Sequence, residues 1–359
     1  MGKSMKLVIA GGCGEHGRNC FWVKKGKLIW IVDCGLAETA SDCYPRLSRK
    51  MIQSAKYLFL THSHADHAGA IPWLLSMGFS GNVVATESTF EQICFTVPNK
   101  LVLEEVCPEG KGVLGGIRIR WGRSGHCVGS VWYRFRAGSK RILFSGDYTE
   151  HTKVYQTDRI RGRKADFAVL DCAYGMRKQR YGASCRSLIE ELTRLRETIS
   201  IFFLPVPNYG RGSELLQLLW EKFPDSKFYG DVHFIRQLEN LNNNAEWCQE
   251  GRPEFTDVQL YSDRVEQGFV FLSDPQLRST ETKELARKIL EKGGYGVLTG
   301  TVEKDSYSSE LLQKEKASLL YYPVHLNYSQ YLDLAEKNSF KRVLPYHTQD
   351  FQCESEYNF

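Results

Sequence analysis

Four side chains of metal-binding type lie within six consecutive positions of the chain: His62, His64, Asp66 and His67. They follow the apolar run 57–60, which predicts a short buried strand, so the cluster would lie on a loop at a strand end. Imidazole nitrogens and carboxylate oxygens are ligands that zinc and similar divalent ions take. His62 and His64, two positions apart, can point to one side, whereas the adjacent pair Asp66 and His67 can turn to another. This spacing predicts a site for two metal ions.

Further residues of the same types stand where later predicted strands end. His126 lies in a glycine-flanked loop between two predicted strands, and Asp147 follows the predicted strand 141–144. Asp147 could bridge two metals with its two carboxylate oxygens. Asp33 leaves the predicted strand 28–32 and could brace the histidine loop, although alone it would more often be a turn residue. A packed core would have apolar residues at such ends, whereas a functional site would have the histidines and aspartates found at three more of them: Asp171, His325 and His347.

Strands and helices alternate along most of the chain, which predicts an α/β fold. After residue 175 a second alternation begins, and strands that end in histidine return near residue 318. We therefore expect one domain from 1–175 and 318–359, with a second α/β domain, 176–317, inserted into it. Within the insertion, Ser213 is expected to cap the start of a helix.

The composition fits a globular protein with a substantial core, since 42% of the 359 residues are hydrophobic and 25% are charged. The net charge of +5 is mild and does not by itself imply a nucleic-acid partner. No stretch approaches the ~20 apolar residues of a membrane span, and the apolar run near the N-terminus is too short for a signal peptide. The eleven cysteines are scattered without a C-x-x-C pair, which predicts reduced thiols and a cytoplasmic protein that does not associate with a membrane.

The assembled motifs resemble those of the β-CASP branch of the metallo-β-lactamase superfamily, which includes the cleavage-and-polyadenylation endonuclease, the Integrator nuclease, RNase J and archaeal relatives. HSHADH resembles the H-x-H-x-D-H signature, and the opening GGCGEHGRNC is similar to G-A-G-x-E-V-G-R-S-C. VDCG, SGHCVGS and SGDYTE resemble the motifs at Asp33, His126 and Asp147. PVPNYGRGSELL is similar to P-x-F-A-x-G-R-x-Q-E-L, which lies inside the insertion. The later segments DCAYG, PVHLN and PYHTQ resemble the motifs at Asp171, His325 and His347.

This resemblance covers nearly the whole chain, with two departures inside the insertion. The insertion is shorter than in most members, and SDPQLRSTE matches the usual S-x-P-G-M-x-x-x-G segment only loosely. Both departures concern substrate preference rather than the metal chemistry.

The resemblance implies a metallo-β-lactamase αββα sandwich with an inserted α/β β-CASP cap domain, and a hydrolase that uses two Zn²⁺ ions, with Mn²⁺ as the alternative. A hydroxide formed between the metals would attack a phosphodiester, with Asp66 among the catalytic groups. His325 would protonate the leaving oxygen, and Asp171 would hold its imidazole in place. The ligands of one metal would be His62, His64, His126 and Asp147, and those of the other Asp66, His67, Asp147 and His347.

The same resemblance favours single-stranded RNA as substrate, because DNA-directed members usually carry valine where His347 stands. Arg177 and Arg211 could then contact phosphates and Tyr174 could stack on a base. Structural readings remain open for these residues: a solvated charge run around Arg177, packing for Tyr174, a helix cap for Asp171 and a packed strand-end histidine for His325. His151 and His233 match no motif and are expected at the surface.

Two alternatives to a ribonuclease follow from the same scaffold. A small-molecule metallo-hydrolase, acting on a lactone, a thioester or a cyclic nucleotide, would have a closed pocket in place of a through-cleft. An RNA-binding subunit that has lost its metals would lack part of the ligand set. The complete set argues against the second alternative, and the short insertion leaves the first one open.

Overall fold

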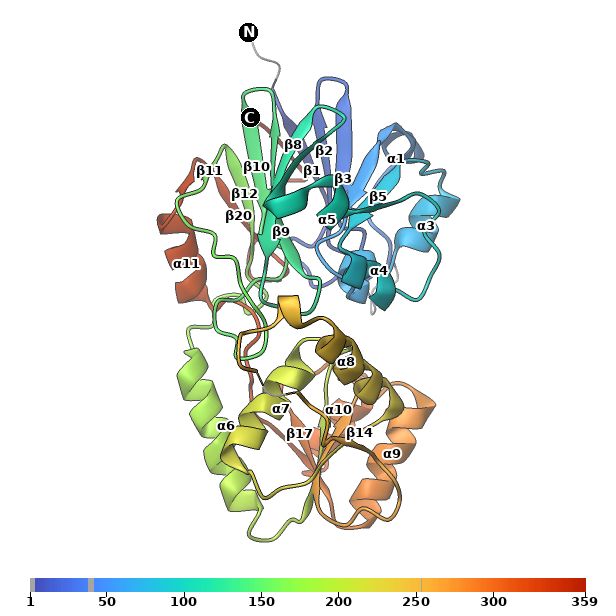
Figure 1. The fold of residues 1–359 in the computed structure, drawn as a ribbon, viewed down its shortest axis with the longest axis vertical. Helices are drawn as coiled ribbons and strands as arrows, with labels where there is room; N and C mark the ends of the chain where they lie inside the picture. Colours follow the sequence, from blue (N-terminus) through green and yellow to red (C-terminus); the bar gives the residue numbers. More distant parts are fainter. Residues whose placement is uncertain (1–3, 38–41, 253) are drawn as a thin grey trace. The chain divides into compact units, whose positions relative to one another are not determined.

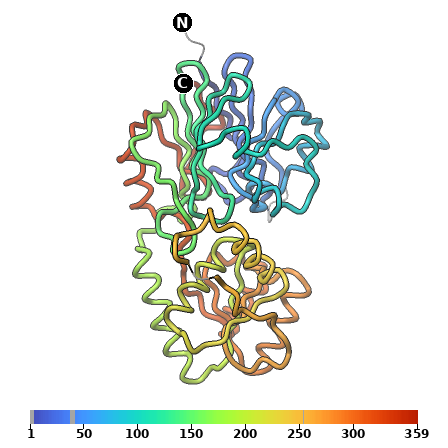
Figure 2. The backbone as a smooth tube through the Cα atoms, viewed as in Figure 1, coloured from blue at the N-terminus to red at the C-terminus, as the bar shows by residue number. Residues whose placement is uncertain are grey.

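The computed structural model describes residues 4–37, 42–252 and 254–359. The chain divides into two compact units, which Figures 1 and 2 trace by colour along the sequence. Unit 1 is built from the described parts of Met1–Glu150, with Gln156–Lys178 and His325–Phe359. Unit 2 is built from His151–Tyr155 and the described parts of Gln179–Val324. The short segment His151–Tyr155, which the sequence placed in the first predicted domain, thus belongs to the second unit.

Unit 1 contains two large sheets (Figure 1). The first has seven strands, of which four pair antiparallel and the rest continue parallel, in the order β21 (Glu356–Asn358), β1 (Lys6–Gly11), β2 (Cys20–Lys25), β3 (Leu28–Val32), β4 (Tyr57–Phe59), β5 (Asn82–Ala85) and β6 (Lys100–Val102). The second has six strands in the order β20 (Val343–Tyr346), β12 (Phe167–Asp171), β10 (Lys140–Phe144), β9 (Val131–Ala137), β8 (Ile117–Arg123) and β7 (Lys111–Leu114). A short pair, β11 (Lys164–Ala165) and β19 (Ser339–Phe340), lies beside them.

Aromatic side chains fill the space between the two sheets. Phe21 contacts Phe144, with ring centroids 5.4 Å apart, and Trp30 contacts Phe135 at 5.6 Å. Strand residues that alternate with these face outward, where helices cover part of each sheet. Outside the first sheet pack α1 (Arg49–Ser54), α3 (Ile71–Ser76) and α4 (Glu87–Gln92), and outside the second packs α11 (Tyr328–Glu336). This layered arrangement confirms the predicted αββα sandwich.

The loop after β3 shows why glycine is needed beside the histidine run. A Cβ atom on Gly35 would lie 1.6 Å from the carbonyl oxygen of Asp66, so only glycine lets helix α2 (Ala65–Ala68) approach. The backbone N–H of Cys34 then donates to the carbonyl of His67 at 2.7 Å. These contacts fix the helix that carries Asp66 and His67 against the end of β3.

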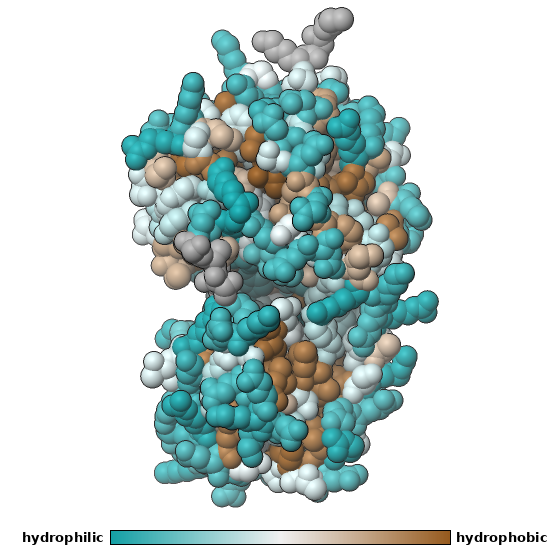
Figure 3. Space-filling view, turned by 180° about the vertical axis from the view of Figure 1, so that it is seen from behind, coloured by the Kyte–Doolittle hydropathy of each residue, from teal (hydrophilic) through white to brown (hydrophobic). Residues whose placement is uncertain are grey.

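Unit 2 is an α/β domain around one parallel sheet, in the order β15 (Gln259–Leu260), β14 (Phe228–Gly230), β16 (Gly268–Leu272), β13 (Ile201–Pro205), β17 (Tyr295–Leu298) and β18 (Ala317–Leu319). Its central strands β13 and β16 are continuous apolar runs, as strands covered on both faces are. On the face that Figure 3 shows, the surface of this unit is mainly hydrophilic, with hydrophobic residues exposed in places. The helices of this unit are α6 (Tyr181–Leu195), α7 (Arg211–Lys222), α8 (Val232–Asn243), α9 (Thr280–Glu291) and α10 (Tyr307–Gln313).

The remaining elements are short and belong to connections. Unit 1 has α5 (Leu103–Val106) and a 3₁₀ turn at Pro108–Gly110, and unit 2 has a 3₁₀ turn at Ala245–Trp247. Among the described residues, no helix combines the length and the apolar character needed to cross a bilayer.

Two local predictions were wrong. Ser213 does not cap α7, because the helix already begins at Arg211, and the buried Ser213 hydroxyl donates to the carbonyl of Gly210 at 2.9 Å instead. The cysteines are not all reduced, since Cys13 and Cys353 form a disulfide with their Cα atoms 6.3 Å apart. These two residues are 340 positions apart in sequence, so no local spacing could have indicated the pair.

Candidate metal centre

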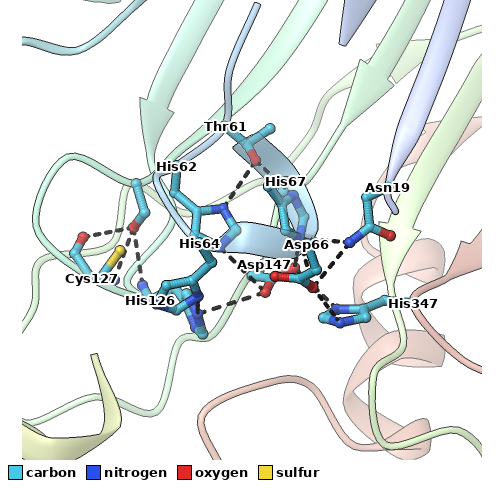
Figure 4. Close-up of polar contacts among 12 residues, drawn as sticks. Asn19, Thr61, His62, His64, Asp66, His67, His126, Cys127, Asp147 and His347 are labelled. Atoms are coloured by element: carbon cyan, nitrogen blue, oxygen red, sulfur yellow. Dashed lines mark hydrogen bonds and ion pairs between the residues drawn. The ribbon is translucent and has the colours of Figure 1, made fainter. Parts of the chain in front are cut away.

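Asp147 lies between two groups of potential metal ligands (Figure 4). It follows β10, whose end is linked to the histidine loop by the close approach of Gly146 (φ 57°) to Thr61. One carboxylate oxygen, Oδ2, lies 3.6 Å from His62 Nε2 and 3.6 Å from His126 Nε2. His64 completes this first group, with its Nδ1 3.3 Å from His126 Nε2.

The other oxygen of Asp147 faces the second group. Its Oδ1 lies 3.1 Å from His67 Nε2 and 3.2 Å from His347 Nδ1. Asp66 closes this group, with its Oδ2 3.0 Å from His347 Nε2. In each group one ligand atom from every residue lies within 4.8 Å of the others. The structure therefore brings together all seven residues that the sequence nominated as metal ligands, and divides them into the two predicted sets.

Groups behind the cluster hold the imidazoles in place. Asp33 lies 2.9 Å from His67 Nδ1, and its other oxygen accepts from the backbone N–H of Thr61 at 2.8 Å. Thr61 Oγ1 donates to Asp33 and lies 3.1 Å from His62 Nδ1. With Nδ1 of His67 engaged by a carboxylate, Nε2 is left to face the cluster, as in histidines that bind metals. Asp33 thus contacts the histidine loop, and its role in bracing a metal site stays a prediction.

Two of these positions also carry unusual backbone angles. Asp33 and His347 have φ values of 57° and 68°, in the left-handed region that residues other than glycine rarely adopt. The His347 backbone is fixed by a hydrogen bond from its N–H to the carbonyl of Gly12 at 2.6 Å. Such conformations cost of order 1–3 kcal/mol each and persist where the surroundings determine them, often at functional sites.

The buried charges of the cluster shift one another's pKa values. Burial would raise the pKa of Asp147, but the surrounding imidazoles, His67 and His347 foremost, hold it well below its usual range. Burial would lower the pKa of His347, but Asp147 and Asp66 raise it to about 10. The pKa of His62 falls well below its usual value, because burial and the neighbouring His67 both disfavour its charged form. The cluster therefore favours the charged forms of Asp147 and His347, whereas it favours the neutral form of His62.

The donor set fits divalent metal ions. In the described part of the chain, His62 Nε2 and His347 Nδ1 are buried without a hydrogen-bond partner, although both face Asp147. A buried polar atom without a partner is costly, and a cation bound between the two groups would engage both nitrogens. Nitrogen and carboxylate ligands in sets of four match the preferences of zinc and its neighbours.

His325 and Asp171 form a pair at the edge of the cluster. His325 Nδ1 lies 2.9 Å from Asp171 Oδ2 and 3.8 Å from Asp147 Oδ2. Asp171 is fully buried and also accepts from the backbone N–H groups of Tyr148 and Ala173, each at 2.9 Å. These atoms fix the carboxylate, so it fixes the imidazole in turn. Asp147, Asp171, His325 and His347 also form a third overlapping group of potential ligands.

The predicted substrate-binding residues are distributed over both units. Tyr174 packs edge-on against His325, with ring centroids 5.3 Å apart, and Arg177 is exposed three residues later in unit 1. Arg211 is the first residue of α7 in unit 2, and its guanidinium lies so close to Gly300 that a Cβ there would be 2.0 Å from Nη1. Its role toward a substrate stays a prediction. His151 and His233 are both exposed, as expected.

Sequence reasoning missed several residues of the centre. Asn19 Nδ2 donates to Asp66 Oδ2 at 3.2 Å and lies 2.8 Å from His67 Nε2, and the Tyr346 hydroxyl donates to Asp147 Oδ1 at 3.1 Å. The exposed His16 lies against His347, with ring centroids 5.8 Å apart. Asn19 and His16 stand where the family segment has serine and valine. These two differences from the family could have indicated that both residues lie near the centre.

Comparison with known proteins agrees with this geometry. Residues 13–87 match the Metallo-beta-lactamase superfamily. A transcription termination factor FttA of Methanocaldococcus jannaschii is 22% identical over 360 residues, which cover 88% of this chain and 55% of that protein. The cleavage and polyadenylation specificity factor 73 of Drosophila melanogaster is 25% identical over 260 residues, which cover 62% of this chain and 37% of that protein. The chain thus spans about half or less of the length of these relatives.

Two further proteins extend the comparison. An RNase J-like protein of Methanocaldococcus jannaschii is 23% identical over 269 residues, which cover 67% of this chain and 62% of that protein. A solved structure of a protein of unknown function from Enterococcus faecalis V583 has the same fold, with a TM-score of 0.63 over 99% of both chains and 11% identity. The predicted resemblance to the β-CASP branch of the metallo-β-lactamase superfamily is confirmed, since residues 13–87 match that superfamily and the chain is similar to these relatives.

Proposed function

We propose that this chain is a metal-dependent phosphodiesterase that uses two zinc ions to cleave single-stranded RNA, with His325 as general acid. One observation carries the proposal: the two carboxylate oxygens of Asp147 face different groups of potential ligands, and the His325–Asp171 pair lies beside them. A single metal would not need a carboxylate whose two oxygens face different sets of histidines. The names of the relatives support RNA as substrate, since they include an endoribonuclease Ysh1 of Emericella nidulans, 25% identical over 261 residues, which cover 62% of this chain and 29% of that protein.

The residues of the chain divide the work between binding and proton transfer. Zinc ions bound to the two groups would supply a hydroxide nucleophile at neutral pH and positive charge for the phosphoryl oxygens. Asp147 would hold the two positions at a fixed separation, and Asp66 would orient the attacking oxygen from the second group. The Asp171 carboxylate engages His325 Nδ1, which leaves Nε2 to donate a proton to the departing oxygen. Asp33 would keep His67 in the tautomer that presents Nε2 to the metal.

The proposal is tested by incubating the zinc-loaded chain with RNA labelled at the 5′ or the 3′ end, with DNA of the same sequence and with cyclic nucleotides. We expect cleavage of RNA that requires metal and falls by at least about a thousandfold in Asp147→Ala. The matched control is His233→Ala, which removes an exposed histidine of unit 2 and should leave the rate unchanged. Turnover of cyclic nucleotides without cleavage of RNA would favour a small-molecule hydrolase instead, and full activity of Asp147→Ala would overturn the mechanism.

A further inference from the structure

One face of the second sheet in unit 1 carries a cluster of arginines that the metal chemistry does not use. Strands β8, β9 and β10 lie side by side (Figure 1), and their residues alternate between the core and the outer face. Ile119 and Phe135 are buried on the inner side. The side chains that point outward, together with one from the segment before β11, form what we call the arginine face: Arg118, Arg120, Arg134, Arg136, Arg141 and Arg163.

The strand register places these arginines directly opposite one another. Arg136 pairs across the sheet with Arg118 on one side and with Arg141 on the other, and Arg120 pairs with Arg134. Neighbouring strands are about 4.8 Å apart and alternate residues along a strand about 6.6 Å apart, so the guanidinium groups form a dense grid. Like charges directly opposite each other destabilise a sheet. A chain that maintains three such pairs bears a cost that an anionic partner would remove.

The protein itself supplies little opposing charge. No ion pair of the described residues includes any member of the arginine face, and the Nε atoms of Arg134 and Arg163 are buried without a hydrogen-bond partner there. The nearby carboxylates are already engaged, Asp158 by Arg123 and Asp166 by Lys341. Burial and then the neighbouring arginines, Arg120 first, lower the pKa of Arg134.

The chemistry of this face fits a phosphodiester backbone. Guanidinium groups bind phosphate through paired hydrogen bonds, and the cluster uses arginine at every position, where lysine would serve for solubility alone. A protein partner would need an apolar centre and a membrane would need apolar anchors. On β7, β8, β9 and β10 the only large hydrophobic side chain with high exposure among the described residues is Val113. A nucleic-acid backbone needs neither.

The face also continues from the metal centre. His126 lies in the loop that joins β8 to β9, and Arg120 and Arg118 precede the end of β8 at Arg123 by three and five residues. At the rise of a β-strand this is about 10 and 17 Å along the sheet. We propose that the arginine face binds the backbone of an RNA strand outside the metal centre, so that long substrates are held at two places. This inference rests on the proposed function for its choice of RNA.

The test measures binding without cleavage. In an Asp147→Ala background, the anisotropy of fluorescein-labelled oligouridylate of about 30 nucleotides is followed over a series of KCl concentrations, with the double variant R118Q/R120Q. We expect affinity to fall about fivefold to tenfold and the slope of log K against log salt to become shallower by about 1.4, since each single-strand phosphate contact contributes about 0.7. R118K/R120K, which keeps the charge, should recover most of the slope. The matched control K222Q/K227Q removes two exposed lysines of unit 2 and should change neither quantity.

The outcomes separate this inference from the proposed function. If R118Q/R120Q weakens binding but the intact centre cleaves no RNA, the arginine face stands and the proposed function fails. If RNA is cleaved but affinity and slope are the same in R118Q/R120Q, the inference is overturned. It is also overturned if polyglutamate or phosphatidylserine vesicles, and not RNA, lose affinity in that variant. A melting temperature no lower than that of the wild type shows that the variant is folded. In the active chain, an oligouridylate of about 8 nucleotides should be cleaved equally by wild type and variant.

Discussion

Asp147 in unit 1 and Glu214 in unit 2 are both carboxylates with 2% exposure, yet their surroundings differ in kind. Glu214 accepts hydrogen bonds from the Tyr322 hydroxyl at 3.0 Å, from the backbone N–H groups of Lys153 and Val154 at 3.0 and 2.9 Å, and from Thr152. Asp147 faces four ring nitrogens of histidines within 3.6 Å. Burial raises the pKa of Glu214 despite its donors, whereas the imidazoles hold the pKa of Asp147 well below its usual range.

This difference distinguishes a structural carboxylate from a candidate metal ligand. The partners of Glu214 are neutral donors that satisfy both oxygens, so the group is complete within the protein. Among the imidazoles that face Asp147, those of His62 and His347 each have a buried nitrogen without a hydrogen-bond partner within the described part of the chain, and bound cations would engage both nitrogens. The comparison can be tested at both positions and at the groups around them.

The largest expected change, apart from loss of Asp147 itself, comes from His325. His325→Ala should lower the rate of RNA cleavage by about a hundredfold to a thousandfold while the metal content stays the same, because only the proton for the leaving oxygen is lost. A p-nitrophenyl phosphodiester has a leaving group that needs no proton, and its hydrolysis should be nearly unaffected. An equal loss with both substrates would mean that His325 is structural.

Removal of Glu214 should affect stability and not metal binding. Glu214→Ala leaves the N–H groups of Lys153 and Val154 buried without their acceptor, and we expect the free energy of unfolding to fall by about 3 kcal/mol. Urea denaturation measures this loss, and the metal content of the folded protein should equal that of the wild type. A Glu214→Ala protein of wild-type stability would contradict the structural assignment.

Removal of the carboxylate behind His67 should weaken metal binding moderately. Asp33→Asn replaces the acceptor of the Nδ1 proton, and the affinity for zinc should fall about tenfold to a hundredfold. Competition with a fluorescent chelator measures the change. Asp158→Asn is the matched control, since Asp158 pairs with Arg123 in the same unit and touches no ligand. Equal affinities of the two variants would remove Asp33 from the centre.

The smallest expected change per step of the measurement is a pH dependence of the metal-free protein. The pKa of His347 rises from 6.5 in the unfolded chain to about 10 in the folded one, so its ion pairs stabilise the fold fully below pH 6.5. This stabilisation is lost as the pH rises through about 10, at no more than about 1.4 kcal/mol per pH unit for one proton. Urea denaturation in EDTA should show this decline in wild type and a weaker one in His347→Asn. A stability that increases with pH in this range would contradict the assignment.

The sequence predicted which candidate ligands lie together, because histidines and aspartates stand at the ends of apolar strand-like runs. His62, His64, Asp66 and His67 are adjacent, and Asp147, Asp171, His325 and His347 each follow an apolar run that reads as a strand. Contacts between distant segments left no such pattern. Asn19 contacts Asp66, which is 47 positions away in the sequence, and the Tyr346 hydroxyl contacts Asp147, which is 199 positions away.

Two other features could not be predicted from the sequence, because they too depend on contacts between distant segments. The Cys13–Cys353 pair joins the two ends of unit 1, and residue spacing carries no information about it. The arginine face depends on register: Arg118, Arg136 and Arg141 become neighbours only when β8, β9 and β10 pair in one particular alignment. The mild net charge of the whole chain gave no indication that positive charge is concentrated on this face.

The central claim is that the chain has two metal positions that share Asp147. The metal content of the protein tests this claim most directly. Elemental analysis of the purified, zinc-equilibrated protein should give about two zinc ions per chain, about one in either His64→Ala or His347→Ala, and fewer than one in Asp147→Ala. These values follow from the division of His64 and His347 between the groups and from the presence of Asp147 in both. One zinc ion or none in the wild type, or two in Asp147→Ala, would contradict the account.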